Sequence, residues 1–326
     1  MLSGRSGRLA PLRLGGALAD GAHRNLSDRY RLGRLLGVGS GGSVYAAEEL
    51  ETGEVVALKR LDRMEPRRLE GLKNEFRLRK ELRHPNLVEL YRLHVEPSEA
   101  FLTMELISGM RLDRWLASRS DSFDAPRLET LSLASMPTSG GTTVNTLGID
   151  DPLPESWPAP LASEVRRAYA AILDGLIAVH DAGLVHRDLK HGNVIVSDDG
   201  RVVIVDFGLA ARVGEHDDGA SNPRRAAGTV PFMAPEQILG ARPSPASDCF
   251  AVGVMLYRSL CGQVPYRGQL QRGLRARENA DRVPLAELAP EAPEDILALV
   301  DELLAPDPAD RPTAHQARRR ISDEPP

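Results

Sequence analysis

A polar string at positions 186–193, HRDLKHGN, holds the chain's densest group of side chains that could do chemistry. Asp188 could accept a proton from an attacking hydroxyl group, or orient that group. Lys190 could neutralise charge on a transferring phosphoryl group, and Asn193 could help to hold a divalent metal. Taken alone, the string is also consistent with a polar turn that contains a salt bridge.

A second acidic motif begins eighteen residues after Asp188, where Asp206-Phe207-Gly208 follows the β-type run Val202–Val205. An aspartate at the end of a strand is suited to carry Mg²⁺ that bridges nucleotide phosphates. A simple β-turn would also explain three such residues. The two motifs together, in this order and at this spacing, favour chemistry over two unrelated turns.

A glycine-rich segment, GVGSGGSV at 37–44, lies between two β-type runs rather than between a strand and a helix. This context argues against a dinucleotide-binding turn, in which the third glycine opens a helix. Glycines in a hairpin instead let the backbone close over phosphates, because no Cβ stands in the way. By itself the segment is about as consistent with a flexible hairpin as with a nucleotide loop.

A lysine ends the next β-type run, fifteen residues after Val44, in the string Val56–Lys59. A lysine at the edge of an apolar run normally extends its ammonium group into water. If Lys59 faces inward beneath the glycine segment, it needs a carboxylate partner. Glu75, on the helical pattern that follows, is well placed to supply one.

The elements that must position these residues fall into two parts with different patterns. The first part is typical of an antiparallel five-stranded sheet that carries one helix. Its β-type runs are 30–36, 43–48, 54–61, 87–93 and 101–107, and its helical pattern runs from 69 to about 84. The second part is mainly helical, with apolar spacing at 112–117, 165–179, 248–260 and 293–304. Together they predict an α+β fold.

In this order the motifs resemble those of the eukaryotic-like, bacterial-type serine/threonine protein kinase family, over about 30–318. The resemblance implies a bilobal fold, with a β-rich small lobe at 30–107 that carries helix C and a mainly α-helical large lobe at 108–318. It implies transfer of the ATP γ-phosphate to Ser or Thr hydroxyls of protein substrates, with Mg²⁺, or Mn²⁺ in its place, as the metal.

The resemblance also implies roles for individual positions. The catalytic residues would be Asp188, Lys190, Lys59 and Glu75. ATP would be bound by Gly37, Gly39, Gly42, Val44, Ala57, Lys59, Glu105 and Ile107. The metal ligands would be Asn193 and Asp206, and the structural positions of the large lobe would be Glu236, Asp248 and Arg311.

Further positions concern specificity and regulation. Lys190 is typical of Ser/Thr rather than Tyr specificity, and Thr229 resembles the threonine that contacts Asp188 and Lys190 in the family. Arg187 is associated with control by activation-loop phosphorylation, because its charge needs an anion to pair with. Ser221 is the candidate phosphosite. The competing hypothesis is a permanent charge supplied by Glu215, Asp217 or Asp218.

Three features of the sequence depart from the family pattern. His191-Gly192 replaces a pair that usually contains proline, and Phe250 stands where the family commonly has Trp. Arg79 lies one turn after Glu75, where the family places an apolar residue, and a buried charge there would be costly. We expect Leu78 to fill this place or Arg79 to turn to solvent. The alternative is a poorly locked helix that needs a partner for activation.

Composition limits what else the chain can be. Its 326 residues carry 41 basic and 46 acidic side chains, and the net charge of −5 argues against bulk binding to nucleic acid. No apolar run reaches the ~18–20 residues of a membrane span, and two cysteines fit a reducing compartment, so we expect a cytoplasmic protein. The composition leaves the oligomeric state open.

Two segments at the ends of the chain and one inside the domain show no periodic pattern of apolar residues. We expect a disordered basic leader at 1–29 and a tail at 319–326. The stretch at 118–160, rich in Ser and Thr, is expected to be a flexible insert in the large lobe. A passive loop is the favoured reading of this insert, and a docking or autophosphorylation segment is the alternative.

Two alternatives belong to other functional classes. A pseudokinase scaffold would bind nucleotide without turnover, but the joint presence of Lys59, Asp188, Asn193 and Asp206 counts against it. A small-molecule phosphotransferase of related fold would share the catalytic and metal-binding aspartates. Such enzymes generally lack the glycine loop and the motif APE, which this chain has at 234–236.

Overall fold

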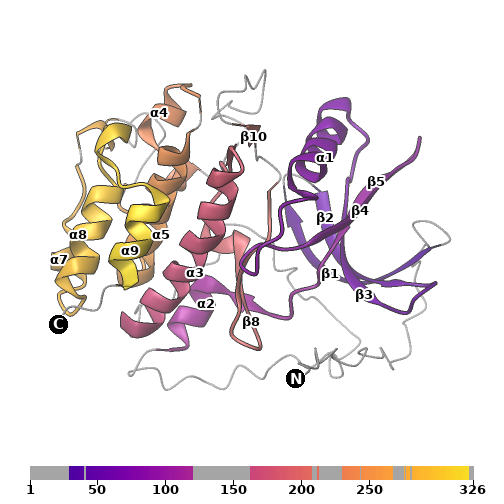
Figure 1. Cartoon of the computed structure of the whole chain (residues 1–326), viewed down its shortest axis with the longest axis horizontal. Helices are drawn as coiled ribbons and strands as arrows, with labels where there is room; N and C mark the ends of the chain where they lie inside the picture. Colours follow the sequence, from indigo (N-terminus) through magenta and orange to yellow (C-terminus); the bar gives the residue numbers. More distant parts are fainter. Residues whose placement is uncertain are drawn as a thin grey trace, which may run out of the picture.

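The small lobe is built on a sheet of five antiparallel strands, drawn on the right of Figure 1. The strands are β1 (Tyr30–Gly39), β2 (Gly42–Glu49), β3 (Val55–Arg60), β4 (Leu90–Val95) and β5 (Ala100–Met104), in the spatial order β1-β2-β3-β5-β4. The computed structural model describes residues 29–39, 42–119, 162–207, 211–212, 230–242, 244–266, 275, 277–279 and 281–322. The five-stranded sheet predicted from the sequence is present.

Alternation along β3 decides which way Lys59 faces. Val56 and Leu58 pack with Phe101 into an apolar cluster on one face of the sheet. Ala57 belongs to the main core instead. Because side chains alternate between the two faces of a strand, Lys59 lies on the same face as Ala57, which is the face toward the large lobe and helix α1.

Helix α1 (Pro66–Arg79) lies beside β4 and β5. A proline in its first turn fits the helix start, where the missing N–H costs nothing. Leu72, Glu75 and Arg79 are all buried, and their spacing of three and four residues puts them on one face of the helix. The helix ends earlier than the apolar pattern predicted, because the chain turns at Arg79, whose carbonyl accepts from the N–H of Leu82 at 3.0 Å.

The large lobe is mainly helical, on the left of Figure 1. Its longer helices are α2 (Leu112–Ala117), α3 (Ala162–Asp181), α5 (Pro245–Cys261), α8 (Glu294–Leu303) and α9 (Ala314–Ser322), with short helices α4 (Pro235–Ile238) and α7 (Leu285–Leu288). A small sheet has the order β6 (Gly109–Arg111), β8 (Val194–Ser197) and β9 (Val202–Ile204), and β7 (Leu184–Val185) pairs with β10 (Ala211–Arg212). This is the helical second lobe that the sequence predicted.

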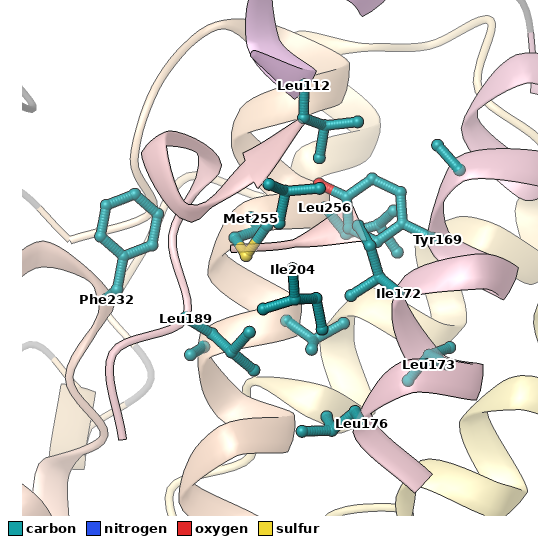
Figure 2. Close-up of a cluster of buried hydrophobic side chains, with 14 of the residues drawn as sticks. Leu112, Tyr169, Ile172, Leu173, Leu176, Leu189, Ile204, Phe232, Met255 and Leu256 are labelled. Atoms are coloured by element: carbon teal, nitrogen blue, oxygen red, sulfur yellow. The ribbon is translucent and has the colours of Figure 1, made fainter. Parts of the chain in front are cut away.

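The core of the large lobe forms where α3 and α5 meet the loop between β7 and β8. Figure 2 shows Tyr169 and Ile172 from α3, Met255 from α5 and Leu189 from that loop converging on one another. Every residue of α5 from Ser247 to Leu260 is buried. A helix that is buried on all sides can hold several surrounding segments at once.

The two lobes are joined by backbone hydrogen bonds beyond the covalent connection. Leu87 forms a parallel bridge with Ile204 of β9. The N–H of Val88 donates to the carbonyl of Ile204 at 3.0 Å, and the N–H of Ile204 donates to the backbone carbonyl of Asn86 at 2.9 Å. The run predicted as one strand over 87–93 is therefore split, since its first residues pair with the large lobe and β4 begins only at Leu90.

Some expected boundaries can be compared with the described residues. Helix α9 continues to Ser322, so regular structure extends past the domain end expected at 318. Most of the leader expected at 1–29 and nearly all of the insert expected at 118–160 lie outside the described residues. Within the described part of the chain, no helix is long and apolar enough to cross a membrane.

Candidate active site

Three charged groups meet where the small lobe faces the large lobe. The ammonium group of Lys59 lies 2.9 Å from Oε2 of Glu75 and 2.9 Å from Oδ1 of Asp206. The Lys59 and Glu75 side chains are 6% and 3% exposed, whereas that of Asp206 is 38% exposed. The contact predicted between Lys59 and Glu75 is therefore present, and it also reaches Asp206 across the lobes.

Burial and charge act in opposite directions on this cluster. Burial alone would lower the pKa of Lys59, but the carboxylates of Asp206 and Glu75 outweigh it and raise that pKa. Burial raises the pKa of Glu75, and the charge of Lys59 opposes this. The lysine is thus held as a cation beside two acidic groups.

The glycine hairpin joins β1 to β2, and β2 pairs with the strand that carries Lys59. Gly37 pairs with Val44, which in turn pairs with Lys59 on β3. Gly42 has a φ of 122°, and a Cβ built on it would lie 2.0 Å from the carbonyl oxygen of Arg60. Gly42 is therefore required by the close approach of the hairpin to β3.

Four positions predicted to bind ATP are Val44, Ala57, Glu105 and Ile107. Ala57 pairs with Met104 across the sheet, and Val44 and Ile107 are partly buried against the main core, to which Ala57 and Met104 belong. The side chain of Glu105 turns to Arg201, with which it forms an ion pair, while its N–H donates to the carbonyl of Glu89 at 2.9 Å. These positions thus offer an apolar surface and backbone groups.

Asp188 lies at the centre of the loop between β7 and β8. Its Oδ2 accepts from Lys190 at 2.8 Å and from the amide of Asn193 at 3.0 Å. Asn193 also donates to the backbone carbonyl of Asp188 at 2.7 Å. The other carboxylate oxygen, Oδ1, is buried and has no hydrogen-bond partner among the described residues. One oxygen is thus held by two donors, and the other has none among the described residues.

Helix α5 holds this loop in an unusual backbone conformation. Asp248 accepts from the backbone N–H of His186 and of Arg187, both at 2.8 Å, and contacts Nε2 of His180 at 3.0 Å. Arg187 has a φ of 72°, the one positive value among the described non-glycine residues. Such a conformation costs energy and persists where surrounding bonds enforce it, as Asp248 does here.

A polar chain that the sequence did not predict lies under the same loop. Nε2 of His191 is 2.9 Å from Oγ of Ser259, which is 2.7 Å from the hydroxyl of Tyr169. Burial, with the nearby charge of Arg258, lowers the pKa of His191 to about 3. His191 is therefore a neutral, buried residue that ties the loop to α3 and α5. No spacing in the sequence pointed to Ser259 or Tyr169.

Glu236 and Arg311, the expected structural pair, form a bidentate ion pair. Nη1 and Nη2 of Arg311 lie 2.7 and 2.9 Å from the two carboxylate oxygens. Ser247 donates to Glu236 at 2.9 Å, and Arg311 lies over the ring of Phe250. The other N–H groups of Arg311 donate to the backbone carbonyls of Ala246, Ala305 and Pro306.

The two predicted regulatory hydroxyl residues, Ser221 and Thr229, lie outside the described residues.

Arg79 corrects one expectation. Its side chain does not turn to solvent: the residue is 1% exposed, and the centre of its guanidinium group lies 3.7 Å from the ring centre of Phe207. Leu78 is only partly buried. The helical register that buries Leu72 and Glu75 buries Arg79 as well, so the position expected to be apolar is filled by a cation. Burial lowers the pKa of Arg79 to about 10.

A β-rich lobe that places a lysine–glutamate pair over an aspartate-bearing loop of a helical lobe defines the protein kinase class of fold. The family model of the protein kinase domain matches residues 30–320, and the chain belongs to this family. Among solved structures, the twitchin kinase region from C. elegans aligns with a TM-score of 0.69 at 24% identity, over 94% of this chain and 48% of that one. The fold predicted from the motifs is confirmed.

Curated relatives are bacterial serine/threonine-protein kinases. Pkn2 of Myxococcus xanthus is 31% identical over 89% of this chain and 32% of its own length. PknA of Mycobacterium tuberculosis (strain ATCC 25618 / H37Rv) is 31% identical over 88% of this chain and 58% of its own length. The chain thus spans about a third to three-fifths of the length of these relatives.

Proposed function

We propose that this domain is a serine/threonine protein kinase, which transfers the γ-phosphate of ATP to Ser or Thr hydroxyls of proteins. The carboxylate of Asp188 carries the proposal. One of its oxygens is fixed by Lys190 and Asn193, and the other is buried with no partner among the described residues. The relatives named above are serine/threonine-protein kinases, which favours the same activity.

The residues present fit a nucleotide and a hard divalent cation. The hairpin between β1 and β2 lies beside the strand that carries Lys59, because Val44 pairs with Lys59, so its glycine backbone would close over phosphates that Lys59 binds. Asn193 and Asp206 supply the oxygen donors that Mg²⁺ or Mn²⁺ prefers. When bound, the cation would neutralise charge on the phosphate oxygens.

The chain's own residues divide the remaining work. Lys59, held by Glu75, would pair with the non-transferred phosphates, and the apolar surface at Ala57 and Met104 would receive the base. Oδ1 of Asp188 would orient the substrate hydroxyl and accept its proton. Lys190 lies close enough to neutralise charge that develops on the transferred group.

We also propose that phosphorylation of the chain regulates this activity. Arg187 precedes the catalytic aspartate, and a phosphate on Ser221 would supply an anion for the site. Ser221 is the candidate because it and Thr229 are the hydroxyl residues between Asp206 and Glu236, and Thr229 has a structural role by resemblance. A fixed acidic charge in the same segment is the competing source.

A labelled-ATP transfer assay tests the function. The wild-type domain with Mg²⁺ or Mn²⁺ should label itself and a generic protein substrate. Asp188→Asn should lower the rate about 10²- to 10⁴-fold, the range for losing a general base. Lys59→Met should also abolish most transfer, because it removes a charge that pairs with phosphate and leaves Glu75 and Asp206 buried or half-buried without it.

The matched control is Lys73→Met, which removes a lysine from α1 away from the cluster and should leave transfer unchanged. Mass spectrometry of the labelled wild-type protein should find phosphate on Ser221. Nucleotide binding without transfer to any protein would instead indicate a pseudokinase. Transfer to small alcohols but not to proteins would indicate a small-molecule phosphotransferase.

A further inference from the structure

The buried arginines of the described part of the chain are Arg79, Arg258, Arg277 and Arg311, and they differ in how their N–H groups are used. Arg311 makes five hydrogen bonds, two of them to Glu236. Arg277 donates to three backbone carbonyls between 230 and 233 and lies over the ring of Tyr266. Arg311 and Arg277 thus follow the usual pattern for a buried guanidinium group, in which hydrogen bonds offset the cost of burying the donors.

Arg258 and Arg79 depart from this pattern. Arg258 leaves its Nε without a hydrogen-bond partner among the described residues. Arg79 departs further: Nη2 donates to the carbonyl of Val88 at 2.9 Å, but both Nε and Nη1 are buried with no partner in the described part of the chain. The carboxylate that attracts it is that of Glu75, one helical turn earlier, and that group is bound to Lys59. Arg79 therefore keeps a charge in a site that satisfies it poorly, and a path to water would stabilise it.

The position of Arg79 links α1 to both halves of the site. Its guanidinium group lies on one side of the Phe207 ring, and the ring of His186 contacts Phe207 with a centroid distance of 4.4 Å. Phe207 directly follows Asp206, and His186 belongs to the loop that carries Asp188. A displacement of α1 that exposed Arg79 would thus also disturb Phe207 and, through it, Asp206.

We propose that Arg79 is a positioning residue that makes the closed position of α1 conditional on a filled site. The poorly satisfied guanidinium favours a state in which α1 moves outward and Arg79 reaches water. The Lys59–Glu75 ion pair favours the closed state described here, and a nucleotide whose phosphates also bind Lys59 would stabilise that state further. This inference rests on the proposed kinase function and adds a regulatory element to it.

Hydrogen exchange of the α1 backbone amides in the nucleotide-free protein tests the inference without any transfer assay. In the wild type, amides of 66–79 should exchange faster than those of the fully buried α5, and ADP should slow them. Arg79→Met keeps the length of the side chain but removes the charge and the unsatisfied donors. It should slow α1 exchange about tenfold without nucleotide, and Arg79→Lys, which keeps the charge, should behave as the wild type.

The inference also predicts how Arg79→Met changes the KM for ATP. If a closed α1 is only partly populated, Arg79→Met should lower the KM for ATP about three- to tenfold with little change in kcat. Arg77→Met is the matched control, because Arg77 is an exposed arginine two residues earlier on the same helix. It should change neither quantity.

Either of two results would overturn the inference. Faster α1 exchange or a lower kcat in Arg79→Met would mean that the guanidinium holds α1 closed by stacking on Phe207. Unchanged exchange in Arg79→Met would mean that its burial does not affect α1. Arg79→Leu repeats the exchange experiment if the methionine variant does not fold. If the wild type transfers no phosphate, the kinase proposal fails, while the exchange data still decide the role of Arg79.

Discussion

Arg311→Met should destabilise the large lobe more than any surface substitution. The Arg311 side chain is 0% exposed and makes five hydrogen bonds, to Glu236 and to three backbone carbonyls. Methionine fills a similar volume but satisfies none of these acceptors. Glu236, with a side chain 15% exposed, would keep a charge whose remaining bond is to Ser247.

The magnitude follows from removing one partner of a buried ion pair, which costs about 3–5 kcal/mol. Folded domains are stable by only about 5–15 kcal/mol in total. Each kcal/mol shifts Tm by about 2–4 °C in domains of 150–250 residues, so the melting temperature should fall by roughly 6–20 °C. Arg311→Lys keeps the charge but offers fewer donors, so its Tm should lie between those of the wild type and Arg311→Met.

Thermal unfolding followed by circular dichroism measures the effect, with Arg318→Met as the matched control. Arg318 pairs with Asp174 at the surface, where both side chains are about a third exposed. Such a pair contributes about 0–1 kcal/mol, so the control should melt within about 4 °C of the wild type. If Arg311→Met melts no lower than Arg318→Met, the reasoning from the five hydrogen bonds is wrong.

Two further predictions concern the loop that carries Asp188. Asp248→Asn should lower kcat at least tenfold with little loss of nucleotide affinity, because the amide offers a single acceptor oxygen where two N–H groups now donate. Equal losses in both quantities would contradict this. The native state should lose stability as the pH falls below about 6.5. Below that pH the histidine of the unfolded chain takes up a proton, whereas the buried His191 of the folded chain, with a pKa of about 3, stays neutral. Urea unfolding from pH 7 to 4 measures the loss, and His191→Asn should flatten the dependence.

The parts of the site that the sequence could predict are those in which spacing along the chain implies proximity. The order of strand and helix predicted that Lys59 would meet Glu75 if Lys59 faced inward, and the structure places it on that face. The order of the two acidic motifs placed Asp188 and Asp206 on neighbouring loops of one lobe. Their catalytic and metal-binding roles stay predictions until transfer is measured.

The parts that the sequence could not predict depend on contacts between distant segments. Ser259 lies ninety residues from Tyr169 and 68 from His191, and a serine in a helix has no periodic signal of its own. The burial of Arg79 ran against the usual behaviour of charged residues on helices, which extend toward water. Tertiary packing overrode that preference, because the register of α1 left no other orientation for this side chain.

The two halves of the site are therefore supported in different ways. On the large-lobe side, α5 holds the loop through hydrogen bonds of Asp248 and Ser259, although the loop itself has buried atoms without a partner among the described residues, namely Nε2 of His186, Oδ1 of Asp188 and Nδ1 of His191. On the small-lobe side, α1 depends on the contacts of Lys59 and carries an arginine with two buried nitrogens that have no partner among the described residues. Because the Asp188 loop is bonded at two points to a helix that is buried from Ser247 to Leu260, whereas α1 lies beside two strands of the small lobe, adjustments of this site should occur in α1 while the Asp188 loop stays in place.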